Sequence, residues 1–296
     1  MGDAGWRARP HEALRAGPGF DLAGLDRAST PGWDGDRDDG EDHAAERGER
    51  LSELQELLYA HGRTGGNRSV LLVLQGLDTA GKGGIVRHVL GAVDPQGVAL
   101  RSFGVPSTEE RAHHYLWRIR NALPRPGAIG VFDRSHYEDV LVVRVAELVA
   151  PEVWAPRYDE INDFEAEVVA SGTVLVKVVL AISPQEQAER LRERLDRADK
   201  HWKYNPGDLD VRAQWHAYEE AYQAVLDRTS TPVAPWYVVP ADRKWYARLA
   251  VTELLIHALE GLDLTWPPAD FDPAAERARL EALTIERQPP DGTSVR

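Results

Sequence analysis

The sequence predicts an α/β fold in which a parallel sheet carries helices on both faces. Two observations predict it. Short, nearly continuous apolar runs with the length of buried strands recur along the chain, and segments with the apolar spacing of amphipathic helices separate them. Strands that alternate with helices form βαβ units, in which neighbouring strands are parallel and each connection crosses one face of the sheet. No internal repeat is visible, so one sheet accounts for the pattern.

The individual elements follow from these runs and spacings. Strands are predicted at 69–75, 128–132, 173–182 and 235–239, with a weaker candidate at 98–103. A helix over about 41–61 follows from leucines that recur at helical spacing, and the turn residues from Gly62 to Asn67 end it. Further helices are predicted at about 82–92, 107–123, 134–149, 157–171, 184–199, 208–228 and 243–260.

These elements form one domain with an extension at each end. Residues 1–45 are a partly irregular N-terminal extension, in which 34–42 is expected to be a solvated acidic loop. Residues 46–265 are the main domain. The tail, 266–296, is polar and rich in proline, and its composition predicts disorder over 285–296.

The composition excludes several classes of protein. The 296 residues contain no cysteine, which rules out disulfides and thiolate metal sites. A formal net charge of −13 argues against nucleic acid as a partner, because such partners demand a basic surface. No apolar run approaches the roughly 18 residues that cross a bilayer, and the segment from Met1 to His11 has no apolar signal region. We expect a cytoplasmic protein that binds neither nucleic acid nor a membrane.

The most informative motif is Gly76-Leu-Asp-Thr-Ala-Gly-Lys-Gly-Gly84, which matches G-x-x-x-x-G-K between a predicted strand and a predicted helix. Such a loop turns its backbone amides toward a phosphate, and Lys82 would reach the terminal phosphate oxygens. The expected phosphate-binding residues are Gly76, Ala80, Gly81, Lys82, Gly83 and Gly84. The alternative is an ordinary glycine-rich turn between a strand and a helix.

The loop departs from the usual motif in two ways. Gly83 stands where a Ser or Thr usually binds Mg²⁺, and Asp78 places a carboxylate among the phosphates. Both departures are explained if Asp78 supplies the metal contact that the missing hydroxyl cannot. Otherwise Asp78 only caps the turn or the helix that follows.

A second carboxylate ends the strand Ile129-Gly-Val-Phe-Asp133. In a parallel sheet this end lies at the same edge as the phosphate loop. Asp133 is therefore expected to share Mg²⁺ with Asp78, and Arg134 to neutralise charge on the transferring phosphoryl group. The alternative is that Asp133-Arg-Ser135 only caps a helix.

Basic residues crowd the segment about 184–210, after the fourth strand. They are Arg190, Arg192, Arg194, Arg197, Lys200 and Lys203. A mobile helix that carries cations over the phosphates is a common device in nucleotide kinases, so we interpret this segment as a lid. The alternative is a solvated helix face, since glutamates lie at i,i+4 spacing. A second basic group, Arg111, Arg118, Arg120 and Arg125, could line a substrate groove. Together the motifs predict a P-loop kinase-like fold with a helical lid.

The same residues resemble the family-2 polyphosphate kinases. The resemblance rests on the phosphate loop 76–84, on Asp133-Arg-Ser-His-Tyr-Glu-Asp139, on Arg194-Leu-Asp-Arg-Ala-Asp-Lys-His-Trp-Lys203 and on the segment 230–246, and it covers about 50–262. The run 135–144 is similar to the class III branch, which phosphorylates AMP as well as ADP. In place of the proline that relatives often have near the lid turn, this chain has Arg197-Ala198.

The resemblance implies the following assignments. The chain would transfer the terminal phosphoryl group of inorganic polyphosphate reversibly to AMP or ADP, with GMP and GDP as further candidates, and it would use Mg²⁺ bound by Asp78 and Asp133. Lys82, Arg134 and Arg194 would complete the catalytic set, while Glu138, Arg194 and Lys200 would contact the nucleotide. A homo-oligomer, a dimer or a tetramer, is also implied. The alternatives are an ATP-dependent nucleotide or small-molecule kinase and a catalytically silent nucleotide-binding regulator.

Overall fold

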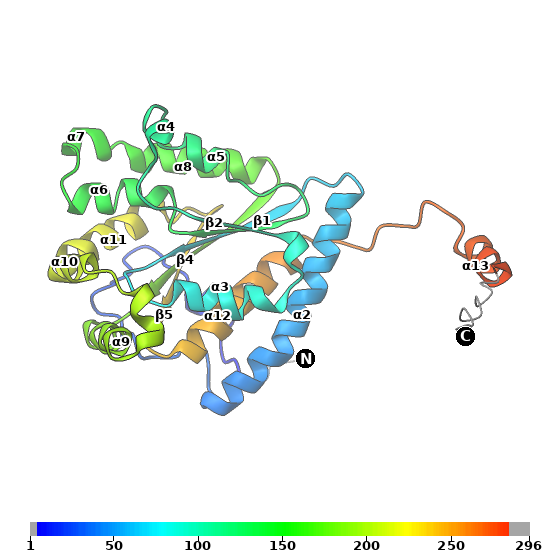
Figure 1. The fold of residues 1–296 in the computed structure, drawn as a ribbon, viewed down its shortest axis with the longest axis horizontal. Coiled ribbons are helices and arrows are strands. Elements are labelled where there is room, and N and C mark those ends of the chain that lie inside the picture. The colour runs from blue at the N-terminus through cyan, green and yellow to red at the C-terminus, as the bar shows by residue number, and fades with distance from the viewer. Residues whose placement is uncertain (1–4, 284–296) are drawn as a thin grey trace, which may run out of the picture. The chain divides into compact units, whose positions relative to one another are not determined.

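The computed structural model describes residues 5–283, and its centre is a five-stranded parallel sheet (Figure 1). The strands are β1 (Ser69–Gln75), β2 (Val98–Ser102), β3 (Ile129–Asp133), β4 (Thr173–Ala181) and β5 (Trp236–Pro240). Their order in the sheet is β2-β3-β1-β4-β5, and all neighbouring strands are parallel. The predicted fold class is thereby confirmed, and the weak strand candidate exists as β2.

Helices cover the sheet on both faces because alternate side chains of its strands point in opposite directions. Leu72 and Leu74 of β1 face a core shared with α2 (Arg37–Arg63), α3 (Lys82–His88) and α12 (Lys244–Glu260). Leu71 and Val73 face a second core shared with α8 (Arg157–Ala170) and α11 (Trp215–Thr229). The central strand is therefore apolar throughout, as the continuous run in the sequence predicts.

The remaining elements are short, except for α9, which belongs to the predicted lid. The helices are α1 (Pro10–Ala13), α4 (Thr108–Arg111), α5 (Trp117–Arg120), α6 (Val142–Val145), α7 (Pro151–Trp154), α9 (Pro184–Asp196) and α10 (Gly207–Ala213). The 3₁₀ turns are η1 (Leu90–Ala92), η2 (Pro95–Gly97), η3 (His136–Asp139) and η4 (Ala198–Lys203). No helix in the described part of the chain is long and apolar enough to cross a membrane.

The first helix after the N-terminal segment begins earlier than predicted. Asp36 caps α2, accepting a hydrogen bond from the amide of Asp39, and the Asp39 side chain accepts one from the amide of Asp36. Carboxylates are favourable in the first turn of a helix, where the amides have no helical partner. Part of the expected acidic loop is therefore the first turn of α2, and the loop prediction was wrong for residues 37–42.

Two predicted helices, 107–123 and 134–149, are interrupted. In the first, the guanidinium of Arg118 on α5 donates to the carbonyl of Gly104 at 2.9 Å. A continuous helix from residue 107 to Arg118 would span about 17 Å and carry Arg118 away from Gly104, so this contact requires the chain to fold back between α4 and α5. In the second, Arg134 has a left-handed φ of 64° and Ser135 is extended, so no helix begins there.

The N-terminal segment pairs with the outer edge of the sheet. The amide of Val238 donates to the carbonyl of Leu14 at 2.8 Å, and the amide of Ala16 donates to the carbonyl of Trp236 at 2.9 Å. Arg15 and Tyr237 form an antiparallel bridge between them. Residues 14–16 thus cover the exposed side of β5.

The chain divides into two compact units, of which the first ends at Thr265 and the second begins at Trp266. In the second unit, α13 (Pro273–Ala282) is capped by Asp272, which accepts from the amides of Ala274 and Ala275. This helix was not predicted from the sequence. The segment 285–296, for which disorder is predicted, lies outside the described residues.

Candidate active site

A cavity of about 430 Å³ opens at the carboxyl ends of β1 and β3. Its lining includes the phosphate-loop residues 78–84, Asp133 and Arg134 from the end of β3, and Arg194 and Lys200 from the lid segment. The structure therefore brings together all the predicted site residues except Gly76 and Glu138, which lie just behind the lining. This edge of a parallel sheet is where ligands bind in α/β proteins.

The phosphate loop has a backbone that glycine makes possible. Gly76 has a φ of 147° and Gly81 a φ of 117°, conformations that other residues rarely adopt. A side chain at Gly76 would also place its Cβ 2.8 Å from the carbonyl oxygen of Leu180. The amides of Lys82 and Gly83 have no hydrogen-bond acceptor within the described residues, so they remain available to an anion.

Lys82 is held inside the loop. Its side chain is buried, and its Nζ donates to the carbonyl of Gly76 at 2.7 Å. Burial lowers the pKa of Lys82, and the nearby charge of Arg134 lowers it further. An anionic phosphate at this point would favour the charged ammonium, because opposite charges at short range raise the pKa of a lysine. The cavity is thus prepared for a group that supplies negative charge.

Arg134 connects the two carboxylate-bearing segments. Its Nη2 lies 2.7 Å from Asp78 Oδ1 in the phosphate loop, and its Nη1 lies 3.8 Å from Glu138 Oε2 on η3. Burial works against the charge of Arg134, but Glu138 and Asp78 outweigh it, so the pKa of the guanidinium lies above its ordinary value. Arg134 therefore stays charged beside the phosphate loop.

Asp78 and Asp133 line the same cavity beside Lys82. In the sheet, Asp133 pairs with Leu74 of β1, four residues before Asp78 in the chain. Carboxylate oxygens suit Mg²⁺, which usually keeps waters and takes only one or two carboxylates besides phosphate oxygens. Residues 5–283 hold no group of three or more His, Cys, Asp or Glu side chains that could hold a metal alone. Two carboxylates beside a phosphate site fit this mode of binding.

Glu138 lies behind Arg134 rather than in the cavity lining. The carboxyl is buried, which raises its pKa above the ordinary value although Arg134 and Lys82 act in the opposite direction. One end of the Gln75 amide lies 3.0 Å from Glu138 Oε1 and the other 3.0 Å from Ser135 Oγ. With its nitrogen toward the carboxylate, Gln75 links the end of β1 to η3.

The lid bases differ in what they contact. Arg194 donates to the carboxylate of Asp208 at 3.1 Å and to the carbonyl of Lys203 at 3.0 Å, and about a quarter of its side chain is exposed. Arg190 is buried and donates to the carbonyls of Thr79, Ala80, Ala241 and Asp242. Arg190 therefore clamps the phosphate loop to the end of β5, a structural role that the grouping with the lid did not anticipate.

The members of the second basic group have different partners. Arg118 contacts the Gly104 carbonyl, Arg120 pairs with Glu167, and Arg125 donates to the Gln96 carbonyl. Arg111 is likewise bound locally, to Pro106. No member of this group lines the cavity at the phosphate loop, so a substrate groove formed by these residues stays a prediction.

Further residues line or border the cavity that the sequence analysis did not single out. Arg87 on α3 and Lys244 and Arg248 on α12 add positive charge to the lining, together with Lys203 of the predicted lid. Asp208 is buried, and burial raises its pKa, with Asp78 adding to the effect. The hydroxyl of Tyr222 accepts from the amide of Gly76 at 3.1 Å. The α12 cations could have been found from their place just after a strand end, as was done for Arg134.

A glycine-rich loop between a parallel strand and a helix, with a buried lysine and two strand-end carboxylates, defines a P-loop phosphotransferase. The family model Polyphosphate kinase 2 matches residues 34–265. The chain belongs to this family.

Two relatives and one solved structure are similar to this chain over most of its length. An AMP/ADP-polyphosphate phosphotransferase of Meiothermus ruber is 44% identical over 262 residues, which are 88% of this chain and 96% of the relative. An ADP-polyphosphate phosphotransferase of Rhodopseudomonas palustris is 41% identical over 79% of this chain and 83% of the relative. The crystal structure of polyphosphate kinase 2 from Arthrobacter aurescens TC1 is similar with a TM-score of 0.91 at 53% identity, covering 93% of this chain and 98% of that one.

Proposed function

We propose that this polyphosphate kinase transfers the terminal phosphoryl group of inorganic polyphosphate reversibly to AMP and ADP, with Mg²⁺ as its metal. The observation that carries the proposal is the single cavity in which the phosphate loop, two carboxylates and the lid arginine meet. The activities for which the relatives from Meiothermus ruber and Rhodopseudomonas palustris are named supply the substrate class. GMP and GDP are further candidate acceptors.

The phosphate loop would hold the end of the polyphosphate chain. The phosphates would be met by the Lys82 ammonium and by the amides of Lys82 and Gly83, which have no acceptor among residues 5–283. The backbone that presents these groups is shaped by Gly76, Ala80, Gly81 and Gly84. Arg87, Lys244 and Arg248 continue the positive lining away from the loop. A linear polyanion uses such an extended set of cations better than a single small phosphate does.

The carboxylates of Asp78 and Asp133 would hold the metal beside the phosphates. Asp78 Oδ1 is occupied by Arg134, which leaves Oδ2 of Asp78 and the carboxylate of Asp133 for Mg²⁺. Mg²⁺ held there would neutralise charge on the phosphate oxygens of donor and acceptor. Arg134 orients the transferring group from the side of β3.

The chemistry asks mainly for positioning and charge neutralisation. The attacking group is an ionised phosphate of AMP or ADP, so no strong general base is required. Arg194 and Lys200 on the lid would approach the nucleotide phosphates, with Arg194 exchanging its contact with Asp208 for a phosphate. The bond to the leaving phosphate of the polymer then breaks as the new phosphate–phosphate bond forms in line.

Glu138 would favour AMP as the acceptor by holding Arg134 and η3 in place behind the nucleotide site. Glu138→Asn keeps a polar side chain but removes the charge and shortens the reach to Arg134. We expect the ratio of kcat/KM for AMP to that for ADP to fall by about tenfold, the effect of losing one charged contact of about 1.4 kcal/mol. An unchanged ratio of the two kcat/KM values would show that Glu138 does not contribute to the choice of nucleotide.

A donor and acceptor scan tests the proposal directly. The purified chain is incubated with Mg²⁺ and AMP, ADP, GMP or GDP, and with polyphosphate or ATP as the donor, and the nucleotide products are separated and measured. Polyphosphate should serve as the donor for AMP and ADP, and omission of divalent metal should abolish turnover. Turnover with ATP and none with polyphosphate would contradict the proposal.

The oligomeric state and cellular location complete the proposal. We propose a homo-oligomer, a dimer or a tetramer, located in the cytoplasm. Light scattering after size-exclusion chromatography checks the first point, since a mass near 32.9 kDa would identify a monomer.

A further inference from the structure

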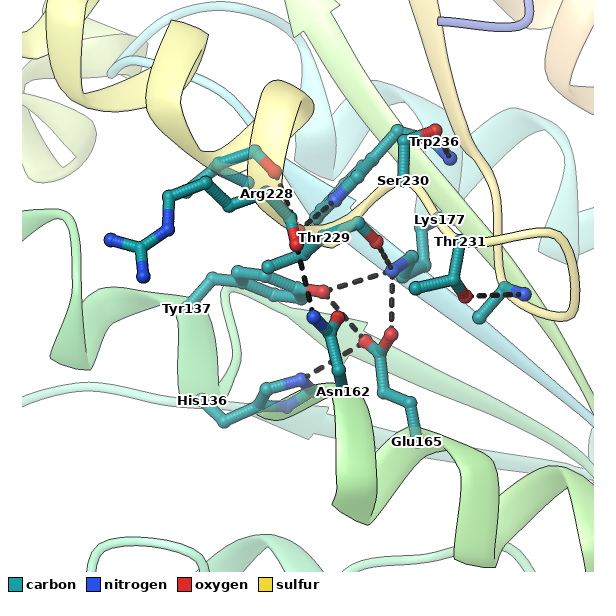
Figure 2. A network of polar contacts seen from close by, with 12 residues as sticks. His136, Tyr137, Asn162, Glu165, Lys177, Arg228, Thr229, Ser230, Thr231 and Trp236 are labelled. Carbon is teal, nitrogen blue, oxygen red and sulfur yellow. Dashed lines mark hydrogen bonds and ion pairs between the residues drawn. The ribbon is translucent and has the colours of Figure 1, made fainter. Parts of the chain in front are cut away.

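A buried polar network contacts His136 and Tyr137, which lie in the chain between Arg134 and Glu138 (Figure 2). Lys177 on β4 and Glu165 on α8 are fully buried, and the Lys177 Nζ lies 2.6 Å from Glu165 Oε2. The same Nζ donates to the hydroxyl of Tyr137 at 2.9 Å and to the carbonyl of Thr229 at 2.8 Å. All three ammonium protons of Lys177 therefore have acceptors.

The network ends on two neighbouring residues of η3. The Tyr137 hydroxyl donates to Glu165 Oε1 at 2.7 Å, while it accepts from Lys177. His136 Nε2 lies 3.3 Å from the same Glu165 oxygen. Figure 2 shows His136 and Tyr137 reaching toward this carboxylate from one side, with Lys177 on the other. Both η3 side chains are buried, so their place is fixed by the ion pair.

These two anchors stand in the chain between Arg134, which lines the cavity, and Glu138, which lies behind Arg134. Arg134 precedes His136 by two positions and pairs with Asp78, and Glu138 follows Tyr137 and approaches Arg134. Arg134 itself holds a left-handed backbone with a φ of 64°, which non-glycine residues adopt only where the surroundings enforce it. The Lys177–Glu165 pair holds His136 and Tyr137 at the centre of this short turn. It therefore also fixes the positions of Arg134 and Glu138 at the two ends of the turn.

Energetics favour a positioning role over a purely stabilising one. Taking a lysine and a glutamate out of water is costly, and their attraction only offsets that loss when the geometry is good. Apolar residues of similar volume are often at least as stable in such places. The Lys177–Glu165 pair contacts the Thr229 carbonyl at the end of α11, and its other partners, His136 and Tyr137, are neighbours in η3. We therefore look for the role of the pair in the position of that turn.

We propose that Lys177 and Glu165 are positioning residues for phosphoryl transfer, acting through Tyr137 to hold Arg134 against the transferring phosphate. The inference rests on the proposed function only for its readout, which is turnover. Neither residue lines the cavity, so any effect on catalysis must pass through η3.

Tyr137→Phe is the sharpest variant because it removes one hydroxyl and keeps the ring. Lys177 and Glu165 stay paired, so the fold should hold. A small displacement of Arg134 should lower kcat by about 10- to 100-fold, with the KM of the nucleotide much less affected. Tyr158→Phe is the matched control, since Tyr158 is also buried and its hydroxyl contacts Arg144 rather than the active-site turn. Equal kcat values for the two variants would overturn the proposal.

A double-mutant cycle separates positioning from general damage. Arg134→Lys keeps the charge but loses the planar fork, so it no longer depends on the exact aim of the turn. In that background Tyr137→Phe should lower kcat by less than about twofold, because residues that act as a unit are non-additive. The same fold-loss in both backgrounds would show that Tyr137 does not act through Arg134.

A third variant guards against unfolding. Lys177→Met combined with Glu165→Leu removes both charges together, so neither is left buried alone. We expect its unfolding temperature to stay near that of the wild type and its kcat to fall as in Tyr137→Phe; full kcat in a folded double variant would overturn the proposal. All comparisons use the donor that the wild type accepts. If the wild type used only ATP, the proposed function would be contradicted. The positioning role of Lys177 and Glu165 would still be tested, with ATP as the donor.

Discussion

Arg134 and Asp78 form an ion pair of 2.7 Å between Nη2 and Oδ1, which joins the end of β3 to the loop after β1. The two residues are 56 positions apart in the chain, yet each belongs to a motif that was expected to hold phosphate or metal. Their contact places a fixed positive charge beside a carboxylate at the mouth of the phosphate loop. The pair aims Arg134 before any substrate arrives.

Asp78→Asn should inactivate the protein without unfolding it. The substitution keeps the shape but removes the charge that Mg²⁺ and Arg134 require. We expect kcat to fall by about 10²- to 10³-fold, the range for losing one electrostatic contact to the transition state. Steady-state turnover with polyphosphate and AMP measures this effect, and circular dichroism confirms the fold. Asp210→Asn, at an exposed position on α10, is the control. Appreciable turnover in Asp78→Asn would refute the assigned role.

Lys82→Ala should abolish transfer as well, for a different reason. The variant loses the ammonium that now contacts the carbonyl of Gly76 and that would meet the phosphates. Calorimetry should show weaker polyphosphate binding together with the loss of turnover, while thermal unfolding stays cooperative. Normal polyphosphate affinity in this variant would place the polymer elsewhere.

Arg194→Ala should separate catalysis from binding. If the lid arginine stabilises charge that develops during transfer, kcat should fall by at least about 10²-fold while the KM of the nucleotide changes little. Arg192→Ala on the same helix is the matched control, because Arg192 is exposed and does not line the cavity. Equal kcat values for the two variants would reduce Arg194 to a partner of Asp208.

Salt should weaken polyphosphate binding more steeply than nucleotide binding, since the polymer makes more charge contacts. Each lost contact should lower the slope of log KM for polyphosphate against log salt by about 0.7, as for other single-stranded polyanions. Lys244→Gln and Arg248→Gln test two cations of the lining, and Arg63→Gln, at the exposed end of α2, is the control. Identical slopes in all variants would argue against an extended basic track.

Glu138→Gln should become more stable relative to the wild type as the pH rises. Burial raises the pKa of Glu138 above its unfolded value of 4.5. The folded wild type therefore binds a proton more tightly than the unfolded chain does, and it loses stability as the pH rises from the unfolded to the folded pKa. Glutamine does not ionise, so the variant escapes this loss. The unfolding temperatures of Glu138→Gln and of the wild type between pH 4 and 8 measure this difference. A stability advantage of the variant that became smaller as the pH rises would contradict the raised pKa of Glu138.

Much of the fold follows from local sequence. The strand runs and the loop 76–84 were legible because parallel strands buried on both faces are apolar throughout and because the glycine-rich turn has a fixed spacing. The meeting of Asp78 and Asp133 at one edge followed from strand direction alone. These features depend on periodicity and chain order, which the sequence carries directly.

Other features depend on contacts between distant residues. The break after β3 arises from the left-handed backbone of Arg134, and the fold-back before α5 from the bond of Arg118 to the Gly104 carbonyl. Neither has a signal in helical spacing. Arg190 looks like any lid base in the sequence, and only its four carbonyl partners reveal that it clamps the loop. Long side chains can serve very different partners, so their charge predicts little about their role.

The pairing of residues 14–16 with β5 has a practical consequence for anyone who shortens the chain. A version trimmed to the span that the family model matches, 34–265, would lack its own cover on that strand. An uncovered edge strand can pair with another chain through its free backbone amides and carbonyls. Such a shortened enzyme would keep its phosphate loop but would be more prone to aggregate than the full chain.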